Sequence, residues 1–251
     1  MRPRLYFIGF ALCLCNTLFA DTATVAVATN FKGAIAKLNA AFQKQYPEHQ
    51  LRYSYASSGT LFNQIIYGAP FDMFLSADSR YPTTLEQRAL GAANSRSTYA
   101  IGRLVAVTSG QIIDSQQGLL ATLDATVKAQ QKVAIANPDL APYGVAAKET
   151  LQYLKRWQSS QASLVKGSNI GQTFQFVATG NAPIGLAALS QVKHLTPAIA
   201  YWPIPQPWYQ PIRQQMILLQ SGENNQAAIS FLAFLKSEPA KQIIRQQGYE
   251  I

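Results

Sequence analysis

Strand-like and helix-like segments alternate along most of this chain, and this alternation restricts its fold more than any other feature. Thr24–Thr29 is a β-branched run typical of a strand, and Phe31–Tyr46 then places apolar residues three or four positions apart. Further strands are expected at Leu51–Ala56, Phe71–Ala77, Ile101–Thr108, Lys132–Ala136 and Ile184–Leu189, and further helices at Leu61–Tyr67, Val145–Trp157, Gln172–Ala178, Asn225–Lys236 and Pro239–Gln247. Such alternation favours an α/β fold with mostly parallel sheets.

The segment from Pro197 to Pro211 departs from this pattern. It contains five prolines, with two tryptophans and two tyrosines between them. Proline fixes the backbone and lacks an N–H donor, so the segment resists both helix and central strand. Two interpretations stay open here: an ordinary extended loop, or a chain crossing between two lobes with aromatic side chains packed at a hinge.

Residues 1–20 have the pattern of a secretory signal peptide. Two arginines precede the apolar run Leu5–Leu14, and cleavage is expected after Ala20. A transmembrane anchor is the alternative, but the run is shorter than the ~20 apolar residues that span a bilayer. Cys13 and Cys15 both lie in this segment, so the exported chain is expected to have no disulfide and no thiol nucleophile.

Composition excludes some classes of protein and leaves others open. The 251 residues are 48% hydrophobic, which allows a substantial core and excludes a disordered chain. A net charge of +9 favours anionic partners without choosing among nucleic acid, anionic lipid and small oxyanions. His49 and His194 lie in turn-like or polar surroundings and are expected to be surface residues rather than catalytic bases. The sequence has no metalloprotease, nucleophile-elbow or P-loop motif. A metal hydrolase or a triad enzyme is therefore disfavoured.

One arrangement occurs four times: a strand ends, a short loop of neutral polar residues or glycine follows, and a helix begins. The four loops are Ala28–Phe31, Ala56–Thr60, Ala141–Gly144 and Gly167–Gly171. In an open α/β sheet such loops face the ligand crevice, and the N–H groups at helix starts bind anions. Helix capping would explain any one loop, but two loops in each half of the chain could close around one small anion.

The chemistry of these loops narrows the choice of anion. They supply Thr, Asn and Ser donors and contain no Asp or Glu. A protonated oxyanion such as hydrogen phosphate requires an acceptor, so donors alone favour an anion without a proton at neutral pH, such as sulfate, molybdate or tungstate. Hydrogen bonds to a charged group contribute about 1.5–3 kcal/mol each, which helps to offset the dehydration of a dianion.

Several longer motifs carry a resemblance to a known family. They are V-A-V-A-T-N-F at Val25–Phe31, Y-A-S-S-G-T-L at Tyr55–Leu61, G-A-P-F-D-M-F-L-S-A-D at Gly68–Asp78, N-P-D-L-A-P-Y-G-V-A-A-K-E at Asn137–Glu149, N-A-P-I-G-L-A-A-L-S at Asn181–Ser190 and F-L-K-S-E-P-A-K-Q-I-I-R-Q-Q-G-Y at Phe234–Tyr249. Together they resemble the periplasmic molybdate-binding proteins, the solute receptors of ABC importers, over nearly all of residues 22–251.

The resemblance implies a type II periplasmic-binding-protein fold, with two α/β lobes joined by two crossovers. The first lobe is expected at residues 21–102, with a return segment at 206–251, and the second lobe at 103–205. The expected protein is a monomeric, non-enzymatic periplasmic receptor without a cofactor. It would bind molybdate, and also tungstate, and deliver the anion to a membrane permease.

The resemblance also implies the site. Side-chain donors are expected from Thr29, Asn30 and Ser58, and backbone N–H donors from Tyr143 and Ile170. All five would donate to oxygen atoms of the oxyanion, and none would bind its metal atom directly. Some family members use a tyrosine hydroxyl where this chain has an alanine, so an additional contact from the first loop is expected to replace it.

Three alternatives stay open. A receptor for sulfate or another tetrahedral oxyanion would have the same architecture. A secreted α/β hydrolase would need a nucleophile–base pair that the sequence does not display. A nucleic-acid binder is suggested by charge alone, and the basic residues are scattered rather than clustered.

Overall fold

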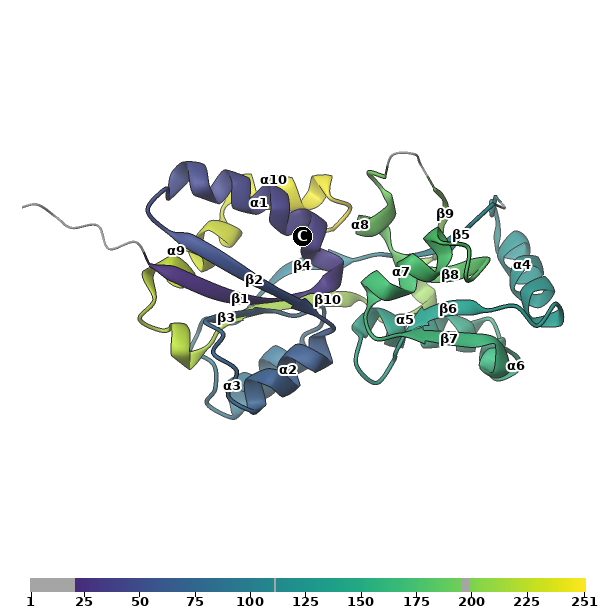
Figure 1. Ribbon diagram of the computed structural model, residues 1–251, viewed down its shortest axis with the longest axis horizontal. Coiled ribbons are helices and arrows are strands. Elements are labelled where there is room, and N and C mark those ends of the chain that lie inside the picture. Colours follow the sequence, from purple (N-terminus) through teal and green to yellow (C-terminus); the bar gives the residue numbers. More distant parts are fainter. Residues whose placement is uncertain (1–20, 111, 196–198) are drawn as a thin grey trace, which may run out of the picture.

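The structure is a computed structural model that describes residues 21–110, 112–195 and 199–251. The expected signal peptide and both cysteines lie outside the described residues. Two sheets stand side by side, each in a lobe of its own and each covered by helices on both faces (Figure 1). No helix in the described ranges is both long enough and apolar enough to cross a membrane.

The first sheet has the strand order β2-β1-β3-β10-β4 and the second has the order β7-β6-β8-β5-β9. The strands of the first sheet are β1 (Thr22–Ala28), β2 (Gln50–Ala56), β3 (Met73–Leu75), β4 (Ser97–Gly102) and β10 (Ile212–Leu218). Those of the second are β5 (Leu104–Thr108), β6 (Val133–Ala136), β7 (Leu164–Gly167), β8 (Ile184–Ala188) and β9 (Ala200–Pro203).

The helices divide between the lobes in the same way. The first lobe has α1 (Lys32–Gln45), α2 (Ser58–Ile66), α3 (Arg80–Gln87), α9 (Gln226–Lys236) and α10 (Glu238–Gln246), with 3-10 turns η1 (Thr29–Phe31) and η4 (Gln220–Gly222). The second has α4 (Gln116–Lys128), α5 (Pro142–Tyr153), α6 (Trp157–Ser160), α7 (Ile170–Ala178) and α8 (Leu189–Val192), with η2 (Gln161–Ser163), and η3 (Gln206–Trp208) follows on the way back.

The α/β class is confirmed, but the sheets are mixed rather than mostly parallel. In the first sheet β1 pairs in parallel with β2 and β3, whereas β10 runs antiparallel to β3 and β4. In the second, β6 is parallel to β7 and β8, whereas β5 is antiparallel to β8 and β9. The antiparallel strands are those next to the lobe crossings, where the chain enters a sheet from the opposite lobe instead of through a covering helix.

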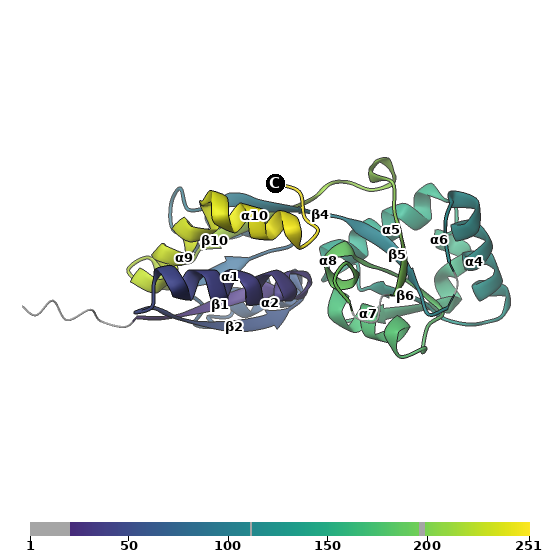
Figure 2. The ribbon, with the colours of Figure 1, turned by 90° about the horizontal axis from the view of Figure 1, so that it is seen from above.

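The chain crosses between the lobes twice, after β4 and after β9 (Figure 2). The first crossing is one residue, Arg103, and the second is formed by residues 204–211, so this part of the proline-rich segment is a lobe crossing and not an ordinary loop. Its aromatic side chains pack as expected: the Trp208 ring lies 5.7 Å from that of Trp202 and stacks on Tyr153 at 5.1 Å. The lobe boundaries expected at 102/103 and 205/206 stay predictions.

Helix-spaced apolar residues bury the faces that the sequence indicated. In α1, Ile35, Leu38 and Phe42 are 0–1% exposed and pack with β1 and with Phe231 of α9. The expectation that His49 lies at the surface was wrong: it is buried, because its ring stacks on Tyr46 and its carbonyl accepts a hydrogen bond from Gln43 Nε2 of α1 at 2.6 Å.

Candidate functional site

All five residues expected to contact the anion line one small cavity between the lobes. The cavity is small, with a volume of about 10 Å³ for the centre of a water-sized sphere. Its lining residues are Ala28, Thr29, Asn30, Ser57, Ser58, Ala77, Ala141, Pro142, Tyr143, Asn169 and Ile170. All four of the loops that the sequence indicated therefore meet at this point, two from each lobe.

The first lobe supplies two hydroxyl groups. Thr29 Oγ1 is buried and has no hydrogen-bond partner in the part of the chain that the structure describes. Ser58 is 1% exposed, and its Oγ accepts a hydrogen bond of 2.9 Å from the backbone N–H of Ala77. Because Ser58 Oγ already accepts, its own proton is available to donate into the cavity. A buried hydroxyl without a partner is unfavourable unless a ligand satisfies it.

The Asn30 side chain has a different task from the one expected. Its Nδ2 donates to Gln214 Oε1 at 2.9 Å and to the Tyr249 hydroxyl at 3.1 Å, so both amide protons are used within the protein. Asn30 still lines the cavity, at the start of the 3-10 turn that leads into α1. Its backbone N–H lies where the first turn of a helix leaves donors unpaired.

The second lobe presents two helix starts to the same cavity. Tyr143 is the second residue of α5, directly after Pro142, and Ile170 is the first residue of α7. Asn169 caps α7 by accepting a hydrogen bond from the Gln172 N–H at 3.1 Å, which leaves the earlier N–H groups free. The Tyr143 ring is 1% exposed, so Tyr143 offers the cavity its backbone rather than its side chain.

The two lobes touch around the cavity. The Gly59 N–H at the start of α2 donates to the Leu140 carbonyl of the second lobe at 2.8 Å. A Cβ on Gly171 of α7 would lie 2.7 Å from Thr29 Cγ2 of the first lobe. Glycine at both positions allows the backbones to approach, and the structure is therefore a closed form.

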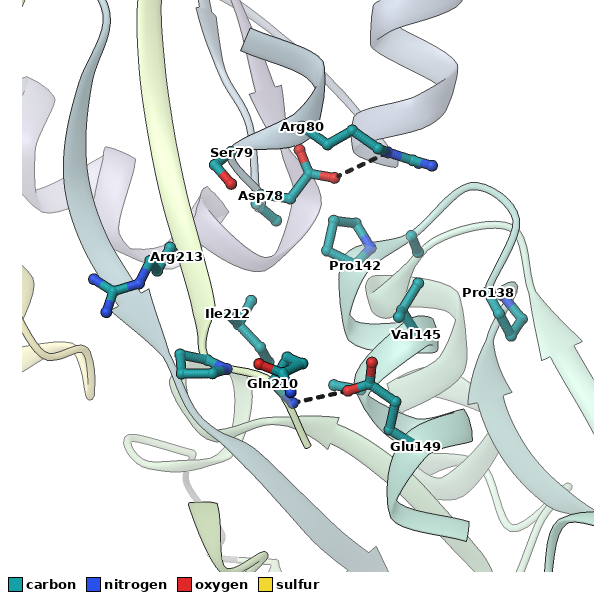
Figure 3. A pocket seen from close by; sticks show the side chains of 14 residues that line it. Asp78, Ser79, Arg80, Pro138, Pro142, Val145, Glu149, Gln210, Ile212 and Arg213 are labelled. Atoms are coloured by element: carbon teal, nitrogen blue, oxygen red, sulfur yellow. Dashed lines mark hydrogen bonds and ion pairs between the residues drawn. The ribbon is translucent and has the colours of Figure 1, made fainter. Parts of the chain in front are cut away.

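No residue that lines the cavity carries a charged side chain, within the ranges that the structure describes. A neighbouring groove, of which Figure 3 shows the lining, shares Ala77, Ala141 and Pro142 with the cavity and has charged side chains in its lining. There the Asp78 carboxylate lies 4.0 Å from Arg80 Nε, and Glu149 accepts the Gln210 N–H at 2.8 Å. Burial raises the pKa of Asp78, against the lowering effect of hydrogen bonds from Tyr81 and Ser76.

The sequence analysis missed a buried polar network behind the cavity. Gln214 of β10 is fully buried, and its Oε1 accepts from Asn30 and from the Tyr99 hydroxyl at 3.0 Å. Its Nε2 donates to the Tyr143 hydroxyl at 3.3 Å. No local pattern indicated this network, because Gln214 lies between Arg213 and Gln215 in the sequence.

Comparison with known proteins agrees with this geometry. Molybdate-binding protein ModA of Rhodobacter capsulatus is 37% identical over 230 residues, which cover 92% of this chain and 88% of the relative. ModA of Azotobacter vinelandii is 37% identical over 245 residues, covering 96% and 94%. The solved structure titled Azotobacter vinelandii periplasmic molybdate-binding protein superimposes with a TM-score of 0.83 at 32% identity, covering 91% of this chain and 99% of that one.

A family of binding proteins, and not of enzymes, also matches almost the whole chain. The match extends over residues 23–250, so it includes both lobes and all four loops of the cavity. The chain belongs to the bacterial extracellular solute-binding proteins.

Proposed function

We propose that this protein is an extracytoplasmic receptor that binds molybdate, and also tungstate, in the cavity between its lobes. The observation that carries the proposal is the meeting of uncharged donors from both lobes, including the unpartnered Thr29 hydroxyl. The ModA relatives, whose names state molybdate binding, support the choice of anion.

The binding set follows from the contacts. Thr29 and Ser58 donate through their hydroxyls, and Asn30, Tyr143 and Ile170 through backbone N–H groups at the starts of η1, α5 and α7. The unpartnered Thr29 hydroxyl takes the part that a tyrosine has in other family members. An uncharged set of donors suits an anion that brings two charges and no proton.

Binding and delivery require a change between open and closed forms. The anion binds one lobe of the open form, and closure then brings the amides of the other lobe onto it. A monomer in the closed form is what the permease of an ABC importer would receive. A cleavable signal peptide at residues 1–20 would place the protein in the periplasm.

Calorimetric competition among molybdate, tungstate and sulfate tests the function. The three anions share charge and shape, so cavity size is the remaining basis for selection. We expect saturable one-to-one binding of molybdate and tungstate, with sulfate weaker by at least about tenfold, or 1.4 kcal/mol. Preference for sulfate would reassign the receptor to that anion, and no binding of any of the three would refute the proposal.

Substitution of the two hydroxyls tests the site. Thr29→Val and Ser58→Ala should each weaken molybdate binding by about 1–3 kcal/mol, because each removes a donor to a charged group. Calorimetry measures the change. Thr179→Val is the matched control, because the Thr179 hydroxyl donates to the Gln175 carbonyl on the exposed end of α7 and does not line the cavity. Unchanged affinity in both site variants would contradict the assignment.

A further inference from the structure

Two side chains and one backbone carbonyl form a bridge between the lobes beside the cavity. Ser190, in α8 of the second lobe, donates from Oγ to the backbone carbonyl of Asn30 in the first lobe at 3.0 Å. The Tyr249 hydroxyl lies 2.7 Å from the same carbonyl and 2.9 Å from Ser190 Oγ. We call Asn30, Ser190 and Tyr249 the closure latch.

Two members of the latch are fixed to the first lobe. Asn30 belongs to η1, and Tyr249 precedes Glu250, whose backbone exchanges two hydrogen bonds with Ile101 of β4, at 2.7 and 3.0 Å. Tyr249 is 4% exposed, and burial raises the pKa of its hydroxyl, which therefore stays a neutral donor. Only Ser190 comes from the other lobe, so its bonds exist only when the lobes are closed.

The second-lobe side of the latch is connected to the anion site. Figures 1 and 2 both show α8 beside the start of α1. Gln191, next to Ser190, donates from Nε2 to the Ile170 carbonyl at 3.1 Å and accepts the Ala188 N–H at 3.1 Å. The latch therefore holds Asn30 from one side and the Ile170 loop from the other, while Ser190 itself lies outside the anion cavity.

We propose that Ser190 and Tyr249 are positioning residues that set how long the closed receptor keeps its anion, through bonds between the lobes rather than contacts with the ligand. The inference rests on the proposed function. The anion leaves through the open form, so the lifetime of the complex increases with the fraction of the loaded receptor that is closed. Loss of the latch should lower that fraction and leave the donors around the anion unchanged.

Stopped-flow kinetics with molybdate tests the latch in the full chain. The anion binds the open form and the latch holds the closed one, so Ser190→Ala should not lower kon and should raise koff three- to tenfold, about the loss of one net hydrogen bond. Tyr249→Phe should do the same. The double variant should show less than the product of the two effects, because both residues belong to one network.

Ser95→Ala is the matched control. Ser95 is 6% exposed, and its hydroxyl donates to the Ala92 carbonyl at 2.7 Å within the first lobe, so its loss should lower stability without changing koff. Small-angle X-ray scattering without ligand tests the latch independently of the proposed molybdate binding. The Ser190→Ala protein should be more extended than the wild type, and the Ser95→Ala protein should not. If the wild type binds no molybdate, scattering alone decides on the latch. The latch proposal would be overturned if Ser190→Ala had the koff and the scattering curve of the wild type. If the wild type binds no molybdate, equal scattering curves of Ser190→Ala and the wild type would overturn it.

Discussion

At the scale of single residues, the structure separates groups that resemble each other in sequence. Thr29 and Asn30 are adjacent and both polar, yet the Thr29 hydroxyl is unpartnered while the Asn30 amide is fully used by Gln214 and Tyr249. The sequence indicated both side chains as anion donors, but it did not indicate that the Asn30 amide is used within the protein. The partners of Asn30 lie 184 and 219 positions away, and only the fold brings them together.

Asp78 gives a pH prediction at the same scale. Burial raises its pKa, so its ionisation opposes folding: the stability is fully present below the ordinary aspartate pKa and decreases as pH rises through the raised value. Asp78→Asn keeps acceptors for Ser76 and Tyr81 and removes the charge. We expect its Tm to exceed that of the wild type by about 2–4 °C at pH 7.5 and to equal it near pH 3.

Calorimetric unfolding at the two pH values measures the difference. Asp114→Asn, which removes an exposed carboxylate, is the control for the loss of one negative charge. An Asp78→Asn protein that is less stable than the wild type at pH 7.5 would show that the ion pair with Arg80 outweighs desolvation.

At the scale of elements, the helix starts are both binding groups and contact surfaces. A Cβ on Gly59 in the first turn of α2 would lie 2.6 Å from the Tyr81 hydroxyl and 2.9 Å from the Leu140 carbonyl of the opposite lobe. Gly59→Ala should therefore hinder closure and weaken molybdate binding by about tenfold or more, although alanine is the better helix former. Calorimetry gives the affinity and scattering the degree of closure.

Gly33 offers the comparison for this variant. It lies in the first turn of α1, and an added Cβ would meet nothing nearer than Gln247 Oε1 at 4.0 Å. Gly33→Ala should keep full affinity. Equal affinity in the two alanine variants would mean that the contact between α2 and Leu140 does not limit closure.

Sequence periodicity predicted most elements but not their pairing. Helices such as α1 and α9 were predicted to within two residues because their apolar spacing is regular. Strand β10 was missed, because the fully buried Gln214 interrupts its apolar pattern. The four loops were found because strand ends and capping residues are local signals, whereas the antiparallel pairs of β10 and β5 depend on where the chain crosses between lobes.

At the scale of the whole molecule, the anion cavity lies between two grooves of different charge. The groove in Figure 3 is lined by the carboxylates of Asp78 and Glu149 and by the guanidinium groups of Arg80 and Arg213, so its formal charges cancel. The groove on the other side shares Thr29, Asn30 and Asn169 with the cavity, and Lys32 is its one charged lining residue among those the structure describes. A dianion approaching through the second groove meets a net positive charge, whereas the charges of the first groove cancel, so we expect the Lys32 side to be the route of access.

Lys32 should therefore steer association. Its Nζ lies 5.6 Å from the centre of the Tyr55 ring, which holds the charge beside the groove without an acidic partner in the described part of the chain. Lys32→Gln should lower kon for molybdate about two- to fivefold at roughly 10 mM salt and have almost no effect at roughly 500 mM, where screening is nearly complete. Lys128→Gln, on α4 in the second lobe, removes the same charge from a residue that does not line either groove. Stopped-flow measurements at both salt concentrations compare the two variants. A decrease in kon confined to Lys32→Gln would place the route of the anion on the Lys32 side. An equal decrease in both variants would mean that net charge alone guides the anion.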